Sequence, residues 1–82
     1  MKRSPLDIHC SDLEMRILSG LMEGYQTKEI AAMLGRRAPT IEGHIRILFA
    51  KFNARSRAQL VAMALRAGLL DTHGAAAEPV SA

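Results

Sequence analysis

The feature that most constrains this chain is a regular series of helix start and stop signals. Ser11-Asp12-Leu13-Glu14 and Ser56-Arg57-Ala58-Gln59 both have the pattern of a capping box, which opens a helix. Thr27 supplies a third helix start, and Pro39 suits the first turn of another helix because no intrahelical partner is needed there. Residues that accept left-handed backbone follow these starts, at Gly24, Gly35, Asn53 and Gly68. We therefore expect four helices, at about residues 12–23, 28–34, 38–52 and 57–67.

The composition favours an all-α fold. Aromatic residues make up only 4% of the 82 residues and Trp is absent, so the core must consist of Leu, Ile, Met and Ala, which favour helices. A chain of this length has room for one small domain. We expect a helix-turn-helix domain over residues 11–70, a flexible N-terminal arm over 1–10 and a disordered tail over 71–82.

The positive charge is concentrated in one part of the chain. The net charge is +3 overall, but residues 36–57 contain six Arg and Lys against Glu42, whereas the segments on either side are each slightly acidic. A basic block beside near-neutral chain is typical of a protein that binds a polyanion. The alternative is a solvated helix face without a ligand.

The sequence argues against several other classes of protein. It has no pairing of a nucleophile with a base and no glycine loop for phosphate, so we expect no enzyme. Cys10 is the single cysteine, and no Cys/His spacing suits zinc, so we expect no metal, cofactor or small-molecule ligand. No apolar run approaches the length of a membrane span or signal-peptide core. We expect a cytoplasmic, nucleoid-associated protein with no membrane contact.

Two short helices joined by a tight glycine turn, followed by a basic helix, form a helix-turn-helix pattern. Three motifs, Lys28-Glu29-Ile30-Ala31, Thr40-Ile41-Glu42-Gly43-His44 and Ser56-Arg57-Ala58-Gln59-Leu60, make the pattern more specific. With their mutual spacing, they resemble the LuxR-type (GerE-like) DNA-binding domain of bacterial regulators over residues 10–70. Region four of a sigma factor shares the first two motifs in part, but not the third.

The resemblance implies a fold and a mode of action. Its second and third helices form the helix-turn-helix, the third enters the major groove and the fourth supplies a dimer contact. Family members usually carry this domain behind a receiver or an acyl-homoserine-lactone sensor, and neither is present in these residues, so we expect a free-standing effector domain. One departure is Arg37, which stands where the family has a Ser or Thr cap. A lost cap costs about 1 kcal/mol.

The third helix carries the expected base contacts. On a helical wheel its apolar residues fall within an arc of about 60°, with Gly43 and Arg46 opposite and Glu42 at the flank. The matching positions of the family face base edges, so we assign base contacts to Glu42, Gly43 and Arg46. Arg46 suits guanine O6 and N7, with phosphate as the alternative. Glu42 either accepts from cytosine N4 or orients Arg46, and Gly43 either lets the helix backbone approach the groove closely or avoids a clash.

Other polar residues are expected to contact phosphates. The set is Thr27, Lys28, Arg36, Arg37, Thr40 and Lys51. For each the alternative is a solvated surface residue or a helix cap, and Thr27 is expected to cap its helix in either case. Glu14 is expected to cap the first helix and to pair with a cation of the basic block.

The fourth helix has more apolar surface than one buried stripe needs. We assign Val61, Met63 and Leu65 to a dimer interface, too small for an obligate dimer, so that a weak homodimer forms on DNA. The sequence thus predicts a sequence-specific transcription regulator that binds a two-fold site in double-stranded DNA. The alternative is an interaction module that heterodimerises with full-length LuxR-type regulators and inhibits or redirects them. RNA polymerase is a further candidate partner.

Overall fold

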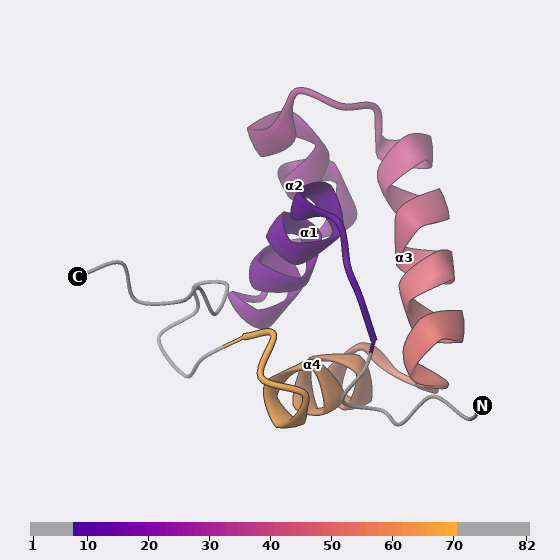
Figure 1. Cartoon of the computed structure of the whole chain (residues 1–82). Coiled ribbons are helices and arrows are strands. Elements are labelled where there is room, and N and C mark those ends of the chain that lie inside the picture. The colour runs from indigo at the N-terminus through magenta and orange to yellow at the C-terminus, as the bar shows by residue number, and fades with distance from the viewer. Residues whose placement is uncertain (1–7, 71–82) are drawn as a thin grey trace.

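The computed structural model describes residues 8–70, and this part of the chain contains four helices. They are α1 (Asp12–Met22), α2 (Thr27–Leu34), α3 (Ala38–Phe52) and α4 (Arg57–Arg66). The predicted all-α fold is confirmed, with every helix end within one residue of its expected position. α3 stands along one side of the domain and α4 lies across its foot (Figure 1). The tail at 71–82 and most of the arm at 1–10 lie outside the described residues.

Local capping explains where α1 and α4 begin. Ser11 Oγ accepts the backbone N–H of Glu14 at 3.1 Å, and Glu14 Oε1 accepts the N–H of Ser11 at 2.9 Å, which completes the predicted capping box. At α4, Ser56 Oγ accepts the N–H of Gln59 at 3.0 Å. The Gln59 side chain does not return to Ser56, because its Oε1 accepts the N–H of Arg55 instead, at 2.6 Å. Of the two bonds of the second capping box, the one from the Ser56 hydroxyl is present. The return bond goes to Arg55, the residue before the N-cap, and not to Ser56.

The expected capping role of Thr27 is wrong. α2 begins at Thr27 itself, and Gln26 is the N-cap. The N–H of Gln26 donates to Glu29 Oε1 at 2.8 Å, because a Glu at the third helical position bonds back to the residue before the helix. The Thr27 hydroxyl instead accepts a hydrogen bond from Arg57 Nη2 at 2.9 Å. Thr27 thus joins the start of α2 to the start of α4.

The other three helices all pack against α3. α3 contacts α1, α2 and α4, and α1 also contacts α4. The inner face of α3 is the predicted apolar stripe, which is wholly buried: Ile41, Ile45, Leu48 and Phe52. The rest of the core comes from α1, α2, α4 and the segment after α4: Ile17, Leu18, Leu21, Ile30, Ala31, Leu60, Ala64 and Leu70. Burial of the inner face fixes which side of α3 remains available to a ligand.

Gly20 of α1 lies directly against Ile30 of α2. A Cβ atom at Gly20 would lie 2.8 Å from Cγ1 of Ile30, closer than real side chains come. Ile30 is fully buried and contributes to the centre of the core. Glycine is unfavourable inside a helix, but here the absence of a side chain lets Ile30 reach the α1 backbone.

Candidate nucleic-acid interface

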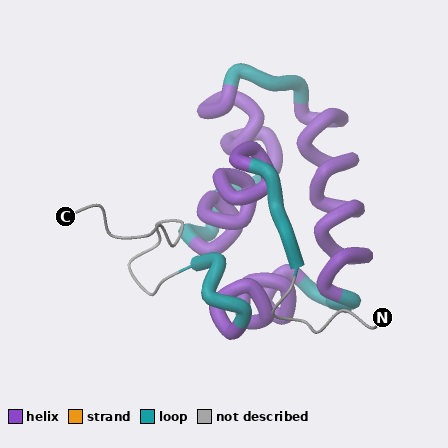
Figure 2. The backbone as a smooth tube through the Cα atoms, viewed as in Figure 1, coloured by secondary structure: helices purple, strands orange, loops and turns teal. Residues whose placement is uncertain are grey.

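The outer face of α3 is the uncovered surface of the helix. Arg46 and Ile47 are exposed and Gly43 is half-buried on the side opposite the buried stripe, and Glu42 is exposed at the flank of that side. Within residues 8–70, no helix or loop lies against this side of α3 (Figures 1 and 2). The three residues predicted to contact bases therefore share one exposed helix surface. Such a surface suits the major groove, which admits an α-helix.

Arg46 and Gly43 are neighbours on this surface. Within 4 Å of a Cβ placed on Gly43, the structure has a single neighbour, Nη2 of Arg46 at 4.0 Å. No hydrogen bond or ion pair joins Arg46 to Glu42 in the described part of the chain, so that carboxylate does not hold the guanidinium. The surface thus has an open glycine notch beside a planar five-donor group, which is suited to two acceptors of one base.

Cationic and polar residues lie at the starts of α3 and α2. Arg36 and Arg37 form the turn between α2 and α3, and Arg37 is the N-cap residue of α3. It makes no capping bond through its side chain, so the cap that the family has at this position is absent. Thr40 and Lys28 are also exposed. All four side chains are accessible to phosphate groups.

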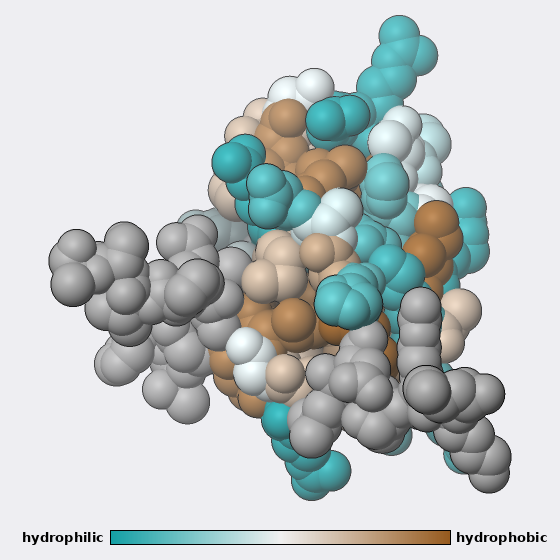
Figure 3. Space-filling view, in the orientation of Figure 1, coloured by the Kyte–Doolittle hydropathy of each residue, from teal (hydrophilic) through white to brown (hydrophobic). Residues whose placement is uncertain are grey.

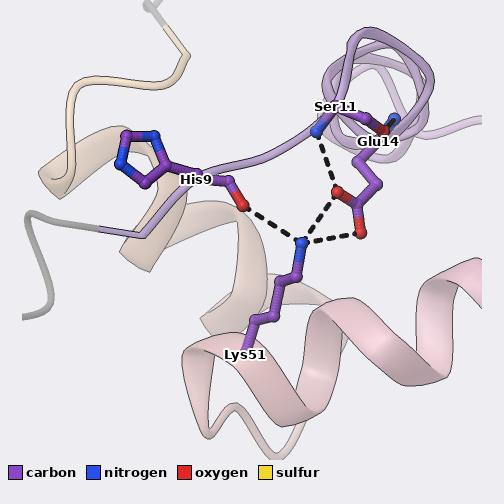
Figure 4. Close-up of polar contacts among 4 residues, drawn as sticks. All are labelled: His9, Ser11, Glu14 and Lys51. Atoms are coloured by element: carbon purple, nitrogen blue, oxygen red, sulfur yellow. Dashed lines mark hydrogen bonds and ion pairs between the residues drawn. The ribbon is translucent and has the colours of Figure 1, made fainter. Parts of the chain in front are cut away.

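Lys51, which was predicted to contact phosphate, is bonded within the domain. Its ammonium group donates to Glu14 Oε1 at 2.9 Å, to Glu14 Oε2 at 3.1 Å and to the carbonyl of His9 at 3.0 Å (Figure 4). These three acceptors occupy the three N–H donors of lysine. The pairing expected between Glu14 and a cation of the basic block is therefore present. In this fold Lys51 is a structural residue that ties the end of α3 to α1.

The pair between Lys51 and Glu14 affects the pKa of two groups, the Glu14 carboxyl and the Cys10 thiol. Burial of Glu14 acts to raise the pKa of its carboxyl, but the hydrogen bonds from Lys51 and Ser11 and the Lys51 charge outweigh it, and the pKa falls below its ordinary value. The pKa of the Cys10 thiol is raised by burial and by the Glu14 charge, against the opposing effect of Lys51. Cys10 is thus a protonated, half-buried thiol that packs against the core.

Arg57 is a candidate that the sequence prediction left out. Its guanidinium is exposed and bonded to the Thr27 hydroxyl, which places a cation of the basic block at the start of α2 beside Lys28. Arg57 and Thr27 are 30 residues apart. The only signal in the sequence was membership of the basic block, because no local pattern reports a contact over that separation.

The predicted dimer residues divide between two flanks of α4. All three are half-buried, but Val61 and Leu65 line a shallow groove against α1, whereas Met63 does not. Positions two residues apart in a helix differ by about 200° around its axis, which places Met63 on the other flank. The remaining lining residues are Leu21, Met22, Arg57, Ala58 and Ala62. Hydrophobic residues also gather where α1 and α4 meet on the face drawn in Figure 3.

Four helices around one core, with a tight turn that leads into an uncovered and cation-flanked α3, define a helix-turn-helix domain. The sequence pattern of bacterial regulatory proteins of the luxR family (GerE) matches residues 10–64, and the chain belongs to that family. Domains of this family are DNA-binding modules of transcription regulators. The family predicted from the sequence is therefore confirmed.

Two curated relatives are similar to this chain. One is response regulator Rre1 of Synechocystis sp., 34% identical over 68 residues, and another is oxygen regulatory protein NreC of Staphylococcus carnosus, 39% identical over 61 residues. The matches cover 83% and 74% of this chain, but only 29% and 28% of those proteins. No solved structure is significantly similar. Among residues 8–70, no helix has the length and apolar character needed to cross a membrane.

Proposed function

We propose that this domain regulates transcription by reading a specific site in double-stranded DNA with α3 in the major groove. The observation that carries the proposal is the exposed outer face of α3, where the Arg46 guanidinium lies beside the open Gly43 notch. Arg36 and Arg37 at the start of the helix add the charge needed to hold it against the phosphates.

Each residue on this surface has a defined role in the proposal. Arg46 donates to O6 and N7 of a guanine, Glu42 accepts from N4 of a cytosine, and Gly43 lets the helix backbone approach the base edges. Phosphate contacts come from the half-buried Thr27 and from exposed cations and a hydroxyl around the helix-turn-helix: Lys28, Arg36, Arg37, Thr40 and Arg57. Lys51 is omitted because its three donors are bonded within the domain.

The test begins with selection of bound sites. Purified protein is titrated on genomic fragments and the bound DNA is sequenced. On the selected site, Arg46→Ala should weaken binding by about 1–3 kcal/mol and relax the preference at one position of each half-site. Arg66→Ala removes an exposed cation at the end of α4 and is the matched control. A loss from Arg46→Ala that is equal on random DNA would make Arg46 a phosphate contact.

We further propose that two copies bind a two-fold site through the groove formed by α1 and α4. The groove is shallow and its lining residues are few, so the free protein should be monomeric at micromolar concentration, with pairing favoured when two half-sites hold two copies together. Val61→Glu should abolish cooperative occupation of the half-sites without unfolding the domain. Gln59→Glu adds the same charge at an exposed position outside the groove and should retain cooperativity.

The same groove favours one other function, heterodimerisation with full-length LuxR-type regulators. In that case Val61→Glu would leave DNA binding and its cooperativity unchanged, and would remove the effect of this protein on the full-length regulator. Footprinting with and without the regulator separates the two functions.

A further inference from the structure

One exposed residue of the α3 outer face has no part in the contacts proposed so far. Ile47 is 49% exposed, whereas the other isoleucines of α3, Ile41 and Ile45, are buried. A single exposed apolar residue is ordinary on a protein surface. Its position is what matters here, because Ile47 follows Gly43 by four residues and precedes Ala50 by three. These spacings place all three on the outer face of the helix.

The surroundings of Ile47 form an accessible apolar surface. Gly43 has no side chain and open space beside it, apart from the Arg46 guanidinium, and Ala50 has only a methyl group. Of the four helical neighbours of Ile47, these two carry the smallest side chains, and the other two are His44 and Lys51. It has no hydrogen-bonding group, so it cannot contribute a polar contact to a phosphate or to a base edge.

We propose that Ile47 recognises the 5-methyl group of a thymine next to the guanine bound by Arg46. The inference depends on the proposed binding of α3 in the major groove. Thymine is the base that presents a methyl group there, and apolar side chains contact it favourably. Ile47 is therefore a specificity-determining residue, and each half-site contains a thymine beside that guanine.

Helix geometry places the thymine close to the guanine. Consecutive residues of a helix rise by about 1.5 Å and turn by about 100°, whereas base pairs are stacked about 3.4 Å apart. Arg46 and Ile47 therefore lie at nearly the same height along α3 but point in different directions. With α3 in the major groove, we therefore expect the two side chains to contact neighbouring base pairs.

The test removes the methyl group from DNA and its contact from the protein. In the selected duplex, each thymidine is replaced in turn by deoxyuridine, which lacks only the methyl group. The whole chain should lose about fourfold in affinity at one thymidine beside the guanine, the value for one buried methyl-sized group. Ile47→Ala should bind the thymidine and deoxyuridine duplexes equally well at that position. Met33→Ala, which removes a 56% exposed side chain from α2, should retain the fourfold difference.

Several outcomes would overturn the inference. If Ile47→Ala retains the fourfold difference, another residue contacts the methyl group. If no thymidine beside the guanine is sensitive, α3 reads no methyl group, and Ile47 belongs to a surface for a protein partner. Failure of the proposed function would give a result distinct from failure of the Ile47 inference. In that case the chain selects no DNA site, and Arg46→Ala has no effect at any guanine. Ile47→Val, which retains most of the side chain, should show a smaller loss of discrimination than Ile47→Ala.

Discussion

Two glycines inside helices illustrate how the same residue type serves opposite purposes. At Gly20 a Cβ would lie 2.8 Å from Ile30 Cγ1, whereas at Gly43 the nearest neighbour, Arg46 Nη2, is 4.0 Å away on a flexible side chain. From the sequence, Gly20 is only an unfavourable residue inside a helix, whereas Gly43 was predicted to lie on the DNA-facing surface. The reason for Gly20 is a contact with another helix, which helix periodicity does not report. Gly43 was recognisable as a surface residue because the apolar stripe of its own helix excludes it.

The first prediction compares alanine at these two glycines. Gly20→Ala should lower the free energy of unfolding by about 1–3 kcal/mol, because the added methyl group crowds a packed core. Gly43→Ala should raise it by up to about 1 kcal/mol through helix propensity alone. Urea unfolding followed by far-UV circular dichroism measures both. In the same Gly43→Ala protein, affinity for the selected DNA should fall, since the added methyl group keeps α3 away from the bases. A stable protein with undiminished affinity would contradict a close approach at Gly43.

At the scale of elements, the four helices were predictable because their signals are local. Caps, helix-ending residues and apolar spacing each involve neighbours within about one turn. The side-chain contacts between helices were harder to predict from the sequence. Lys51 was assigned to phosphate because its position in the basic block favoured that role, and its pairing with Glu14 joins residues 37 apart. The start of α2 was misplaced by one residue because Thr is a common N-cap residue, whereas here the capping contact comes from Glu29, which accepts the N–H of Gln26.

The link between α1 and α3 should make stability depend on pH. The pKa of Glu14 is lower in the folded protein than its ordinary value of about 4.3 in the unfolded chain. The unfolded chain therefore binds more protons in acid, and the stability that Glu14 contributes is present above its unfolded pKa and lost as pH falls through its folded pKa. We expect Glu14→Gln to flatten the acid side of the stability profile.

Two variants control the pH measurement. Glu23→Gln changes an exposed carboxylate next to the end of α1 and should retain the wild-type pH profile. Lys51→Met keeps the apolar stem of the side chain but removes the cation, so it should reduce the pH dependence as Glu14→Gln does. Denaturant unfolding at a series of acidic pH values provides the comparison. An unchanged slope in Glu14→Gln would show that the Lys51 pair contributes nothing to acid stability.

At the scale of the whole molecule, binding to DNA should depend strongly on salt. A dimer that makes about six phosphate contacts should show log K falling against log salt with a slope of about −5. Lys28→Ala should reduce the magnitude of that slope by about one per subunit. Arg16→Ala removes an exposed cation of α1, outside the proposed interface, and should leave the slope unchanged. Fluorescence anisotropy over a salt series measures all three slopes, and an affinity that does not respond to salt would contradict the phosphate contacts.

The bond from Lys51 to the His9 carbonyl also gives tension on the N-terminal side a direct route to the end of α3. His9 precedes α1, so part of a force applied at residue 8 reaches α3 through the Lys51 ammonium group, in addition to the packing of Ile8 against the core (Figure 4). The attachment point of a label or tether should therefore affect how the domain responds to force. In a single-molecule experiment, we expect pulling from the N-terminal side to speed dissociation from DNA more than the same force applied after α4. Lys51→Met should reduce that difference.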